Sequence, residues 1–228
     1  MIKMKKLHTI LRLLPTKRAA VALAITGLTL LIAPGCSKDE TATTIPTLNS
    51  DGYKTLNTTM RKHWGDHMQW TYATVDAFFN NPAALDAHLN RLLQNQKDIG
   101  AAIVPYYGQA AGDTLSALLT THITQAPAVL QAAKDNNQPA LEAALAAWNA
   151  NAEDIADFLS AANPQSWEQV HMREEMKGHI TQTTSYAVDL LQKDYAKAIV
   201  DYETAYNHMM HLADDLSQGI AKQYPGKF

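Results

Sequence analysis

Three histidines recur along the chain at intervals of about 56 residues, and each is followed by two further polar residues. His122 and His179 both begin the tetrapeptide His-Ile-Thr-Gln, and His67 begins the looser copy His-Met-Gln-Trp. The polar residues follow each histidine after 28 to 32 positions: Asn95 and Asp98, Asn151 and Asp154, His208 and His211. Imidazoles and carboxylates are ligands of Zn, Fe, Cu, Ni and Mn. The spacing therefore repeats a set of metal-binding groups three times.

The first hypothesis is a transition-metal site built from side chains that face the interior of a helical bundle. Its third copy is the most favourable, because His208 and His211 lie one helical turn apart and His179 can reach the same ion from the neighbouring helix. Asn95 and Asn151 would orient the ligands through hydrogen bonds. The candidate ligands are the imidazoles of His67, His122, His179, His208 and His211 and the carboxylates of Asp98 and Asp154.

Two other interpretations of the same residues remain open. Each buried histidine can donate to an Asn or Asp on the next helix, which fixes the register of a helix pair without any metal. The protein would then be a metal-free structural or binding module at the cell envelope. If the segment His208-Met209-Met210-His211 is exposed, it is instead a labile copper-binding patch.

Enzymatic function is the third possibility, and the sequence identifies no general base for it. The chain has neither a glycine-rich phosphate loop nor a Gly-x-Ser-x-Gly elbow. A di-iron carboxylate site needs two Glu-x-x-His motifs, whereas only Glu168 to His171 has that spacing. Covalent haem lacks its Cys-x-x-Cys-His motif, but non-covalent haem held by histidine and methionine stays open, with Met68, Met176 and Met209 as candidates.

The elements that must position these residues are helices. From about Asp51 onward Ala, Leu, Gln, Lys and Glu dominate, and prolines fall mostly at breaks such as Asn80-Asn81-Pro82 and Asn163-Pro164. Pro127 lies inside a helical stretch and is expected to kink it. Five breaks predict six helices, approximately over residues 52–79, 83–103, 110–134, 139–161, 166–191 and 194–222.

The second, fourth and sixth of these helices share one apolar pattern. Residues three and four positions apart form a single face, which must be buried. The equivalent apolar positions are Leu85, Leu89, Leu92, Ile99 and Ile103; Leu141, Leu145, Trp148, Ile155 and Leu159; and Ala198, Tyr202, Ala205, Leu212 and Leu216. We expect an all-α fold of three pseudo-repeated antiparallel helical hairpins, with the polar cluster on its inner faces.

The N-terminus is predicted to be an export signal. The first 35 residues contain six basic residues and no acidic one, and an apolar run over residues 19–33 precedes Cys36, the only cysteine. This pattern is typical of a secretory signal, and Cys36 lies where a bacterial lipobox places its lipid-bearing cysteine. The expected organisation is a signal peptide over 1–35, lipidated Cys36 with a flexible tether to residue 50, and a bundle over 51–228. The protein would be anchored to the outer membrane or to a periplasm-facing membrane surface.

The charge after processing disfavours nucleic acid as a partner. The whole chain has 19 basic and 22 acidic residues, and removal of the signal leaves 13 basic against 22 acidic, a net charge of −9. Such a surface repels phosphates. A lipid on Cys36 also leaves no free thiol, so packing or a bound ion must stabilise the exported domain.

Four segments resemble an uncharacterised family of small exported bacterial helical proteins. They are residues 64–71 with His67 and Trp70, 90–100, 118–122 and 148–159, and the similarity spans most of 60–225. The resemblance implies a helical bundle and an export route. Some members carry the automatic label acetylglutamate kinase. Amino-acid kinases are α/β proteins with glycine-rich nucleotide loops, and this sequence shows neither strands nor such loops, so the label is not carried over.

Overall fold

The computed structural model describes residues 48–228, which form an all-helical bundle as predicted. The predicted signal peptide, Cys36 and the tether up to residue 47 lie outside the described residues. No helix within 48–228 combines the length and apolar character that a membrane span requires. The helices are α2 (Asp51–Asn80), α3 (Leu85–Tyr107), α4 (Gln109–Lys134), α5 (Gln138–Ala162), α6 (Gln169–Gln192) and α7 (Tyr195–Gln223), with short 3-10 turns η1 (Pro82–Ala84) and η2 (Pro225–Lys227).

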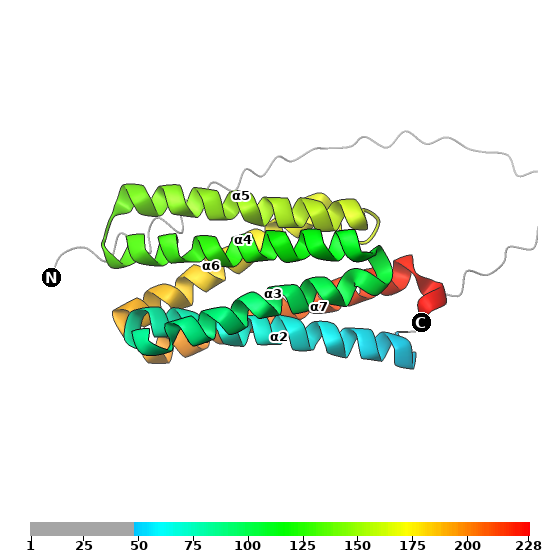
Figure 1. Cartoon of the computed structure of the whole chain (residues 1–228), viewed down its shortest axis with the longest axis horizontal. Coiled ribbons are helices and arrows are strands. Elements are labelled where there is room, and N and C mark those ends of the chain that lie inside the picture. Colours follow the sequence, from blue (N-terminus) through cyan, green and yellow to red (C-terminus); the bar gives the residue numbers. More distant parts are fainter. Residues whose placement is uncertain (1–47) are drawn as a thin grey trace, which may run out of the picture. The chain divides into compact units, whose positions relative to one another are not determined.

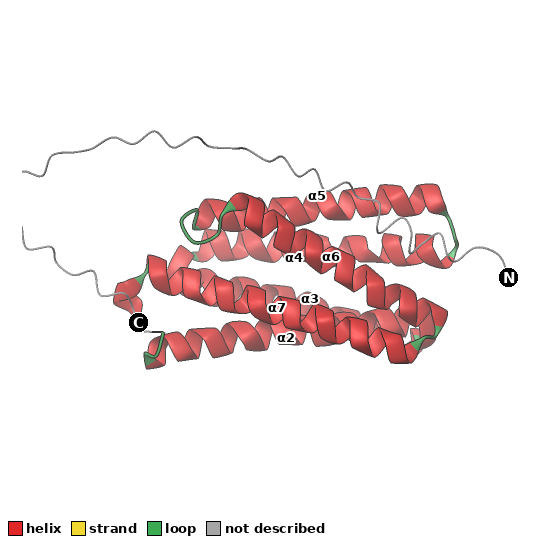
Figure 2. Ribbon diagram, turned by 180° about the vertical axis from the view of Figure 1, so that it is seen from behind, coloured by secondary structure: helices red, strands yellow, loops and turns green. Residues whose placement is uncertain are grey.

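The helices pack as three consecutive hairpins, α2/α3, α4/α5 and α6/α7 (Figures 1 and 2). Each helix contacts the next one in the chain, and α7 returns to pack against α2. In addition, α6 contacts both α2 and α4. The first helices of all three hairpins, which carry the repeated histidines, are therefore brought together.

Side-chain caps begin three of the helices where the sequence has turn residues. Ser50 Oγ accepts from the Tyr53 amide at 3.1 Å, at the start of α2. The Asn137 and Asp194 side chains do the same for α5 and α7. Such caps satisfy amide groups that have no partner inside the helix. Because the capping residues can be recognised in the sequence, the predicted first residues of α2, α5 and α7 differ from the observed ones by only one position.

Two boundaries differ from the prediction. α3 continues through Pro105 to Tyr107 and ends at Gly108, whose φ of 84° is readily adopted only by glycine. α6 begins at Gln169 rather than near 166, because Trp167 is held in the preceding loop. The Trp167 amide donates to the Asn163 carbonyl at 2.9 Å, and the indole Nε1 donates to the Asp215 carbonyl of α7 at 3.1 Å.

α4 continues as one helix from Gln109 to Lys134, so Pro127 does not interrupt it. Proline has no amide hydrogen, and the residue four positions earlier, Ile123, therefore lacks its usual helical donor. Both Ile123 and Pro127 line a cavity of about 230 Å³ inside the bundle.

The core contains most of the predicted apolar positions of all three hairpins, whereas Leu85, Leu89, Leu145 and Tyr202 are only half-buried. Ile99, Ile155 and Leu212, which are equivalent in the repeat, are all fully buried. Met68 and Met176, which flank the central histidines, are also buried. The pseudo-repeat in the sequence is thus a repeat of buried faces, as the three-hairpin prediction requires.

Candidate functional site

Three of the predicted histidines lie side by side at the centre of the bundle. His67 from α2, His122 from α4 and His179 from α6 are only 1%, 2% and 2% exposed. The ring centroid of His179 is 5.5 Å from that of His67 and 5.7 Å from that of His122. His179 therefore lies between the other two imidazoles, on the helix that contacts both of the other hairpins.

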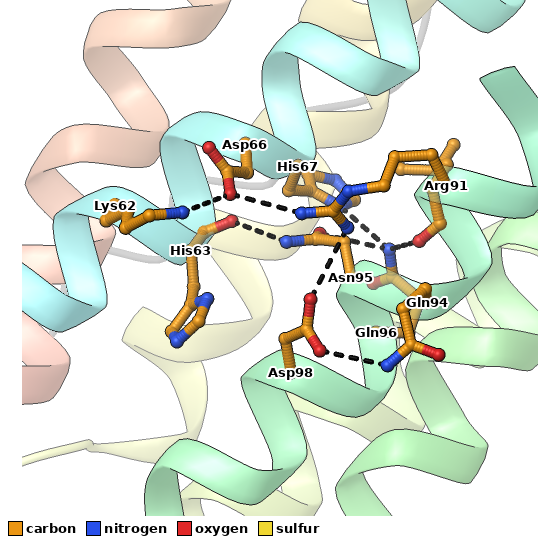
Figure 3. A network of polar contacts seen from close by, with 10 residues as sticks. Lys62, His63, Asp66, His67, Arg91, Gln94, Asn95, Gln96 and Asp98 are labelled. Atoms are coloured by element: carbon orange, nitrogen blue, oxygen red, sulfur yellow. Dashed lines mark hydrogen bonds and ion pairs between the residues drawn. The ribbon is translucent and has the colours of Figure 1, made fainter.

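A hydrogen bond repeated in each hairpin explains the polar residues on the facing helices. Asn95 Nδ2 donates to the His63 carbonyl at 3.0 Å, a contact drawn in Figure 3, and Asn151 Nδ2 donates to the Leu118 carbonyl at 3.2 Å. In the third hairpin His208 Nε2 contacts the Glu175 carbonyl at 2.9 Å, so this nitrogen must be the donor. In every case the acceptor lies four residues before the repeated histidine.

The sequence pattern suggested that the repeated histidines and the polar residues of the facing helices act together. The repeated bond shows that the polar residues fix the register of each hairpin without these imidazoles. The residue on the second helix of each hairpin fixes the register by donating to a main-chain carbonyl, and His208 does what an asparagine amide does elsewhere. The imidazoles of His67, His122 and His179 are not needed for that bond. Their presence on the buried face therefore requires a separate explanation.

His122 is held in a defined tautomer. Its Nδ1 lies 2.9 Å from Asn151 Oδ1, and the Asn151 amide nitrogen is already bonded to a carbonyl, so Nδ1 carries the hydrogen and donates it. Nε2 consequently has a free lone pair, and this buried atom has no hydrogen-bond partner. Trp148 stacks on the ring at 5.0 Å and donates Nε1 to the His122 carbonyl at 2.9 Å.

His67 and His179 also have an unpartnered nitrogen. The Gln96 amide nitrogen donates to the Leu92 carbonyl at 2.7 Å and lies 3.4 Å from His67 Nδ1 (Figure 3). That arrangement favours the lone pair on Nδ1 and the hydrogen on Nε2, which is buried without a partner. His179 Nδ1 is likewise buried and without a partner. A buried polar atom without a partner costs about 1–3 kcal/mol, so three in one place require an explanation beyond the packing of the bundle.

Burial keeps all three imidazoles neutral at physiological pH. Loss of solvation lowers the pKa of His67 to about 3 and that of His122 to about 4, and it lowers the pKa of His179 well below 6.5. The neighbouring imidazoles add to this effect, because two adjacent rings disfavour a shared charge. A neutral imidazole presents a lone pair to a metal ion or to a hydrogen-bond donor.

The three imidazoles line a cavity of about 230 Å³ enclosed mainly by apolar side chains of α2, α3, α4 and α6. No Asp, Glu, Lys or Arg is among its lining residues. The hydroxyls of Thr71 and Thr184 are bonded to carbonyls of their own helices, whereas the buried Thr183 hydroxyl has no partner. Thr74, which also lines the cavity, donates to the Trp70 carbonyl, and a hydroxyl that donates can still accept. The polar groups available to an occupant are therefore the imidazoles and the threonine hydroxyls, of which Thr183 alone has no partner for its hydrogen.

The other four candidate ligands lie outside this cluster. His211 and Asp154 are exposed, and His208 contacts Glu175. Asp98 is partly exposed and bonded to Arg91 and Gln94 (Figure 3). Three residues advance a helix by about 300°, so the second polar residue of each pair lies about 60° from the first and falls outside the buried stripe. The side chains His208 to His211 also do not form one exposed patch, because Met209 and Met210 are buried.

Sequence reasoning missed the glutamines around the cluster. Gln96 contacts His67, and it follows Asn95, to which the role was assigned. Gln125 and Gln182, the last residues of the two His-Ile-Thr-Gln copies, each have a buried amide oxygen without a partner. The signal was present in the two exact copies of the repeat, both of which end in Gln, whereas the looser copy has Trp70 at that position.

The fold and site define a six-helix bundle with a buried cluster of three neutral histidines beside an apolar cavity. Comparisons of the chain with protein-family models, with curated proteins and with solved structures found no match.

Acid is expected to destabilise the bundle already between pH 7 and 5. An unfolded histidine takes up a proton near pH 6.5, whereas the buried imidazoles of His67 and His122 stay neutral to about pH 3 and 4. Only the unfolded chain gains these protons in that window, so the free energy of unfolding falls by about 2 kcal/mol between pH 7 and 5 for each imidazole. Urea midpoints at pH 7 and 5 measure the effect, and His122→Gln should make it smaller. Equal midpoints would contradict the burial of neutral imidazoles.

The shared role of His208 and the two asparagines predicts an unequal response to two substitutions. His208→Asn should leave the free energy of unfolding within about 0.5 kcal/mol of the native value, since an amide makes the equivalent bond in the other hairpins. His208→Leu removes the donor and should cost about 1 kcal/mol. Urea denaturation of both variants tests this. Equal losses in both would show that the imidazole has a different role.

Proposed function

We propose that this protein binds one transition-metal ion through His67, His122 and His179, in a helical bundle anchored to the cell envelope by a lipid on Cys36. The observation that carries the proposal is the set of three adjacent, buried and neutral imidazoles, each with a nitrogen that has no partner. His122 donates to Asn151 on the next helix, as the metal-free interpretation expects, but the contact of His67 is with Gln96 and His179 Nδ1 has no partner, so a role in register accounts for only one of the three.

The ring positions are compatible with a common ion after small side-chain movements. With metal–nitrogen distances of about 2.0–2.1 Å, imidazoles on a tetrahedral ion have their centroids about 5 Å apart. The two measured separations are 5.5 and 5.7 Å. Within residues 48–228, no group of three His, Cys, Asp or Glu side chains is already arranged so that its donor atoms could bind one metal ion. The cavity beside the rings provides room for the rotations that would gather them.

The hydrogen bonds behind His122 match those of a metal ligand. A ligating histidine usually donates its second ring nitrogen to an oxygen that fixes its orientation, and Asn151 Oδ1 accepts from His122 Nδ1 in this way. His67 would need the same tautomer. Gln96 has a buried amide oxygen without a partner, and this oxygen would stabilise that tautomer if it turned toward His67 Nδ1, a movement that gives up the bond from the Gln96 amide to the Leu92 carbonyl.

The donor set favours some metals over others. Imidazole nitrogens suit Zn, Cu, Ni and Fe, whereas Mn is better matched by carboxylates. The carboxylates of Asp98 and Asp154 lie outside the cluster, so Mn fits least well among the metals considered. Three protein donors also leave at least one position of a four-coordinate ion for a ligand that is not part of the chain.

Zinc binding to the full-length mature protein tests the proposal. The protein is purified without chelator for elemental analysis, and its mass reports whether Cys36 carries lipid. After chelator treatment, added zinc should bind one ion per chain, and at 100 times its Kd it should stabilise the fold by about 2.7 kcal/mol. If neither zinc, copper, nickel nor iron is retained or raises the Tm, the proposal is wrong and the cluster is a metal-free structural network.

A further inference from the structure

We propose that the cavity next to the imidazoles binds a small, neutral, mostly apolar organic molecule that carries one hydroxyl group. This inference does not depend on a bound metal, since it follows from the cavity and from the hydrogen bonds available in the metal-free protein. Because it uses the same free nitrogens of His67 and His122 as the proposed metal site, the organic molecule would bind the metal-free protein in place of an ion.

The size of the cavity limits the ligand. A dry engineered cavity of about 150 Å³ is known to hold benzene, and drug-sized ligands occupy about 300–1,000 Å³. A volume of about 230 Å³ therefore suits a substituted single ring or a compact bicycle of about ten non-hydrogen atoms. Haem and nucleotides are far too large for it.

The lining determines the polarity of the ligand. Leu92, Ile123, Val129 and Trp148 are among its buried apolar residues, and no charged side chain reaches it. An ion entering this space would lose its hydration without a compensating charge, which strongly disfavours charged molecules. An entirely apolar molecule would leave the imidazole nitrogens unpartnered.

The tautomers of the imidazoles select a hydroxyl in particular. His122 donates through Nδ1 to Asn151, so its free Nε2 is an acceptor. The Gln96 amide favours a hydrogen on His67 Nε2, which makes that free nitrogen a donor. A hydroxyl is the smallest single group that both donates and accepts, and it can satisfy one nitrogen of each kind.

The cavity is reached from one side of the bundle. Its lining residues with partial exposure are Thr74 of α2 and five apolar residues: Phe78 at the end of α2, Leu85 and Leu89 at the start of α3, and Ala126 and Pro127 of α4. The histidines are at its buried end. A ligand would enter past these apolar side chains with its hydroxyl leading.

Binding of p-cresol to chelator-treated mature protein tests the inference. We expect p-cresol to raise the Tm in a saturable manner, toluene to bind about tenfold more weakly because it lacks the hydroxyl, and charged p-toluate to have no effect. No saturable p-cresol binding would overturn the inference, and equal binding of p-cresol and toluene would overturn the role given to the hydroxyl.

Two matched variants locate the site. Ala126→Phe places a ring in the cavity and should abolish p-cresol binding, whereas Ala147→Phe adds the same ring at an exposed position of α5 and should leave it unchanged. Far-UV circular dichroism confirms that both variants fold. His122→Leu should reduce p-cresol affinity to the level of toluene. Unchanged binding in Ala126→Phe would place the ligand elsewhere and refute the proposal, whatever the outcome of the zinc experiment.

Discussion

His179→Ala is expected to lower zinc affinity by a factor of about 1,000, which in practice abolishes stoichiometric binding. His179 lies between the other two imidazoles, so its loss leaves two nitrogens on α2 and α4, which do not pack extensively against each other. Isothermal titration calorimetry of the chelator-treated protein measures the change. Helicity should be retained, because the register of the third hairpin is fixed by His208 rather than by His179.

Two histidines outside the cluster serve as controls. His211→Ala changes an exposed side chain, and His208→Asn preserves the bond to the Glu175 carbonyl. Both should bind zinc as the native protein does. If zinc affinity falls in His211→Ala and stays unchanged in His179→Ala, the ion is bound at the surface and the central cluster is not a metal site.

Gly100→Ala is expected to destabilise the bundle by about 3 kcal/mol, or about 10 °C in Tm. α3 and α4 approach each other so closely here that a Cβ on residue 100 would overlap Ser116 Oγ and the Gly112 carbonyl oxygen. The contact is reciprocal, since a Cβ on Gly112 would lie 2.8 Å from the Gly100 carbonyl oxygen. Backbone atoms cannot turn away as a side chain can, so the two helices must separate.

Gly65→Ala is the matched control for this effect. Gly65 also lies within a helix, but its added Cβ would meet only side-chain ends, the Tyr206 ring with its hydroxyl at 3.2 Å and Met210 Cε at 3.8 Å. Alanine favours the helix by up to about 1 kcal/mol over glycine, so this variant should be as stable as the native protein or slightly more stable. Thermal unfolding of both variants compares them. A Gly100→Ala variant with native stability would contradict the close packing of α3 and α4.

The helices and their pairing were predictable because their determinants are local. The apolar residues at helical spacing, the turn residues at Asn137 and Asp194 and the prolines after Asn81 and Asn163 all act within a few residues. The predicted start of α6 was wrong because contacts with a distant part of the chain determine it. The loop before α6 is longer than predicted, because Trp167 packs against Gly219 of α7 and is held by the Asp215 carbonyl.

The sequence also predicted which histidines are repeated, but not which of the polar residues face one another. Asn95, Asn151 and His208 share a spacing, and the structure shows that they share a main-chain hydrogen bond. Asp98 and Asp154 share a spacing as well, yet they turn away from the centre. A rotation of about 60° separates a buried position from an exposed one, and spacing alone does not define the centre of the buried face.

The sequence by itself determined an all-helical chain of three similar hairpins, each with a histidine on its inner face, because helix formation and amphipathic burial depend on neighbours along the chain. Only the tertiary structure decided that three imidazoles meet, with free nitrogens beside a cavity of about 230 Å³. The positions of α6 against α2 and α4 bring them together, and these depend on packing between residues more than 50 positions apart.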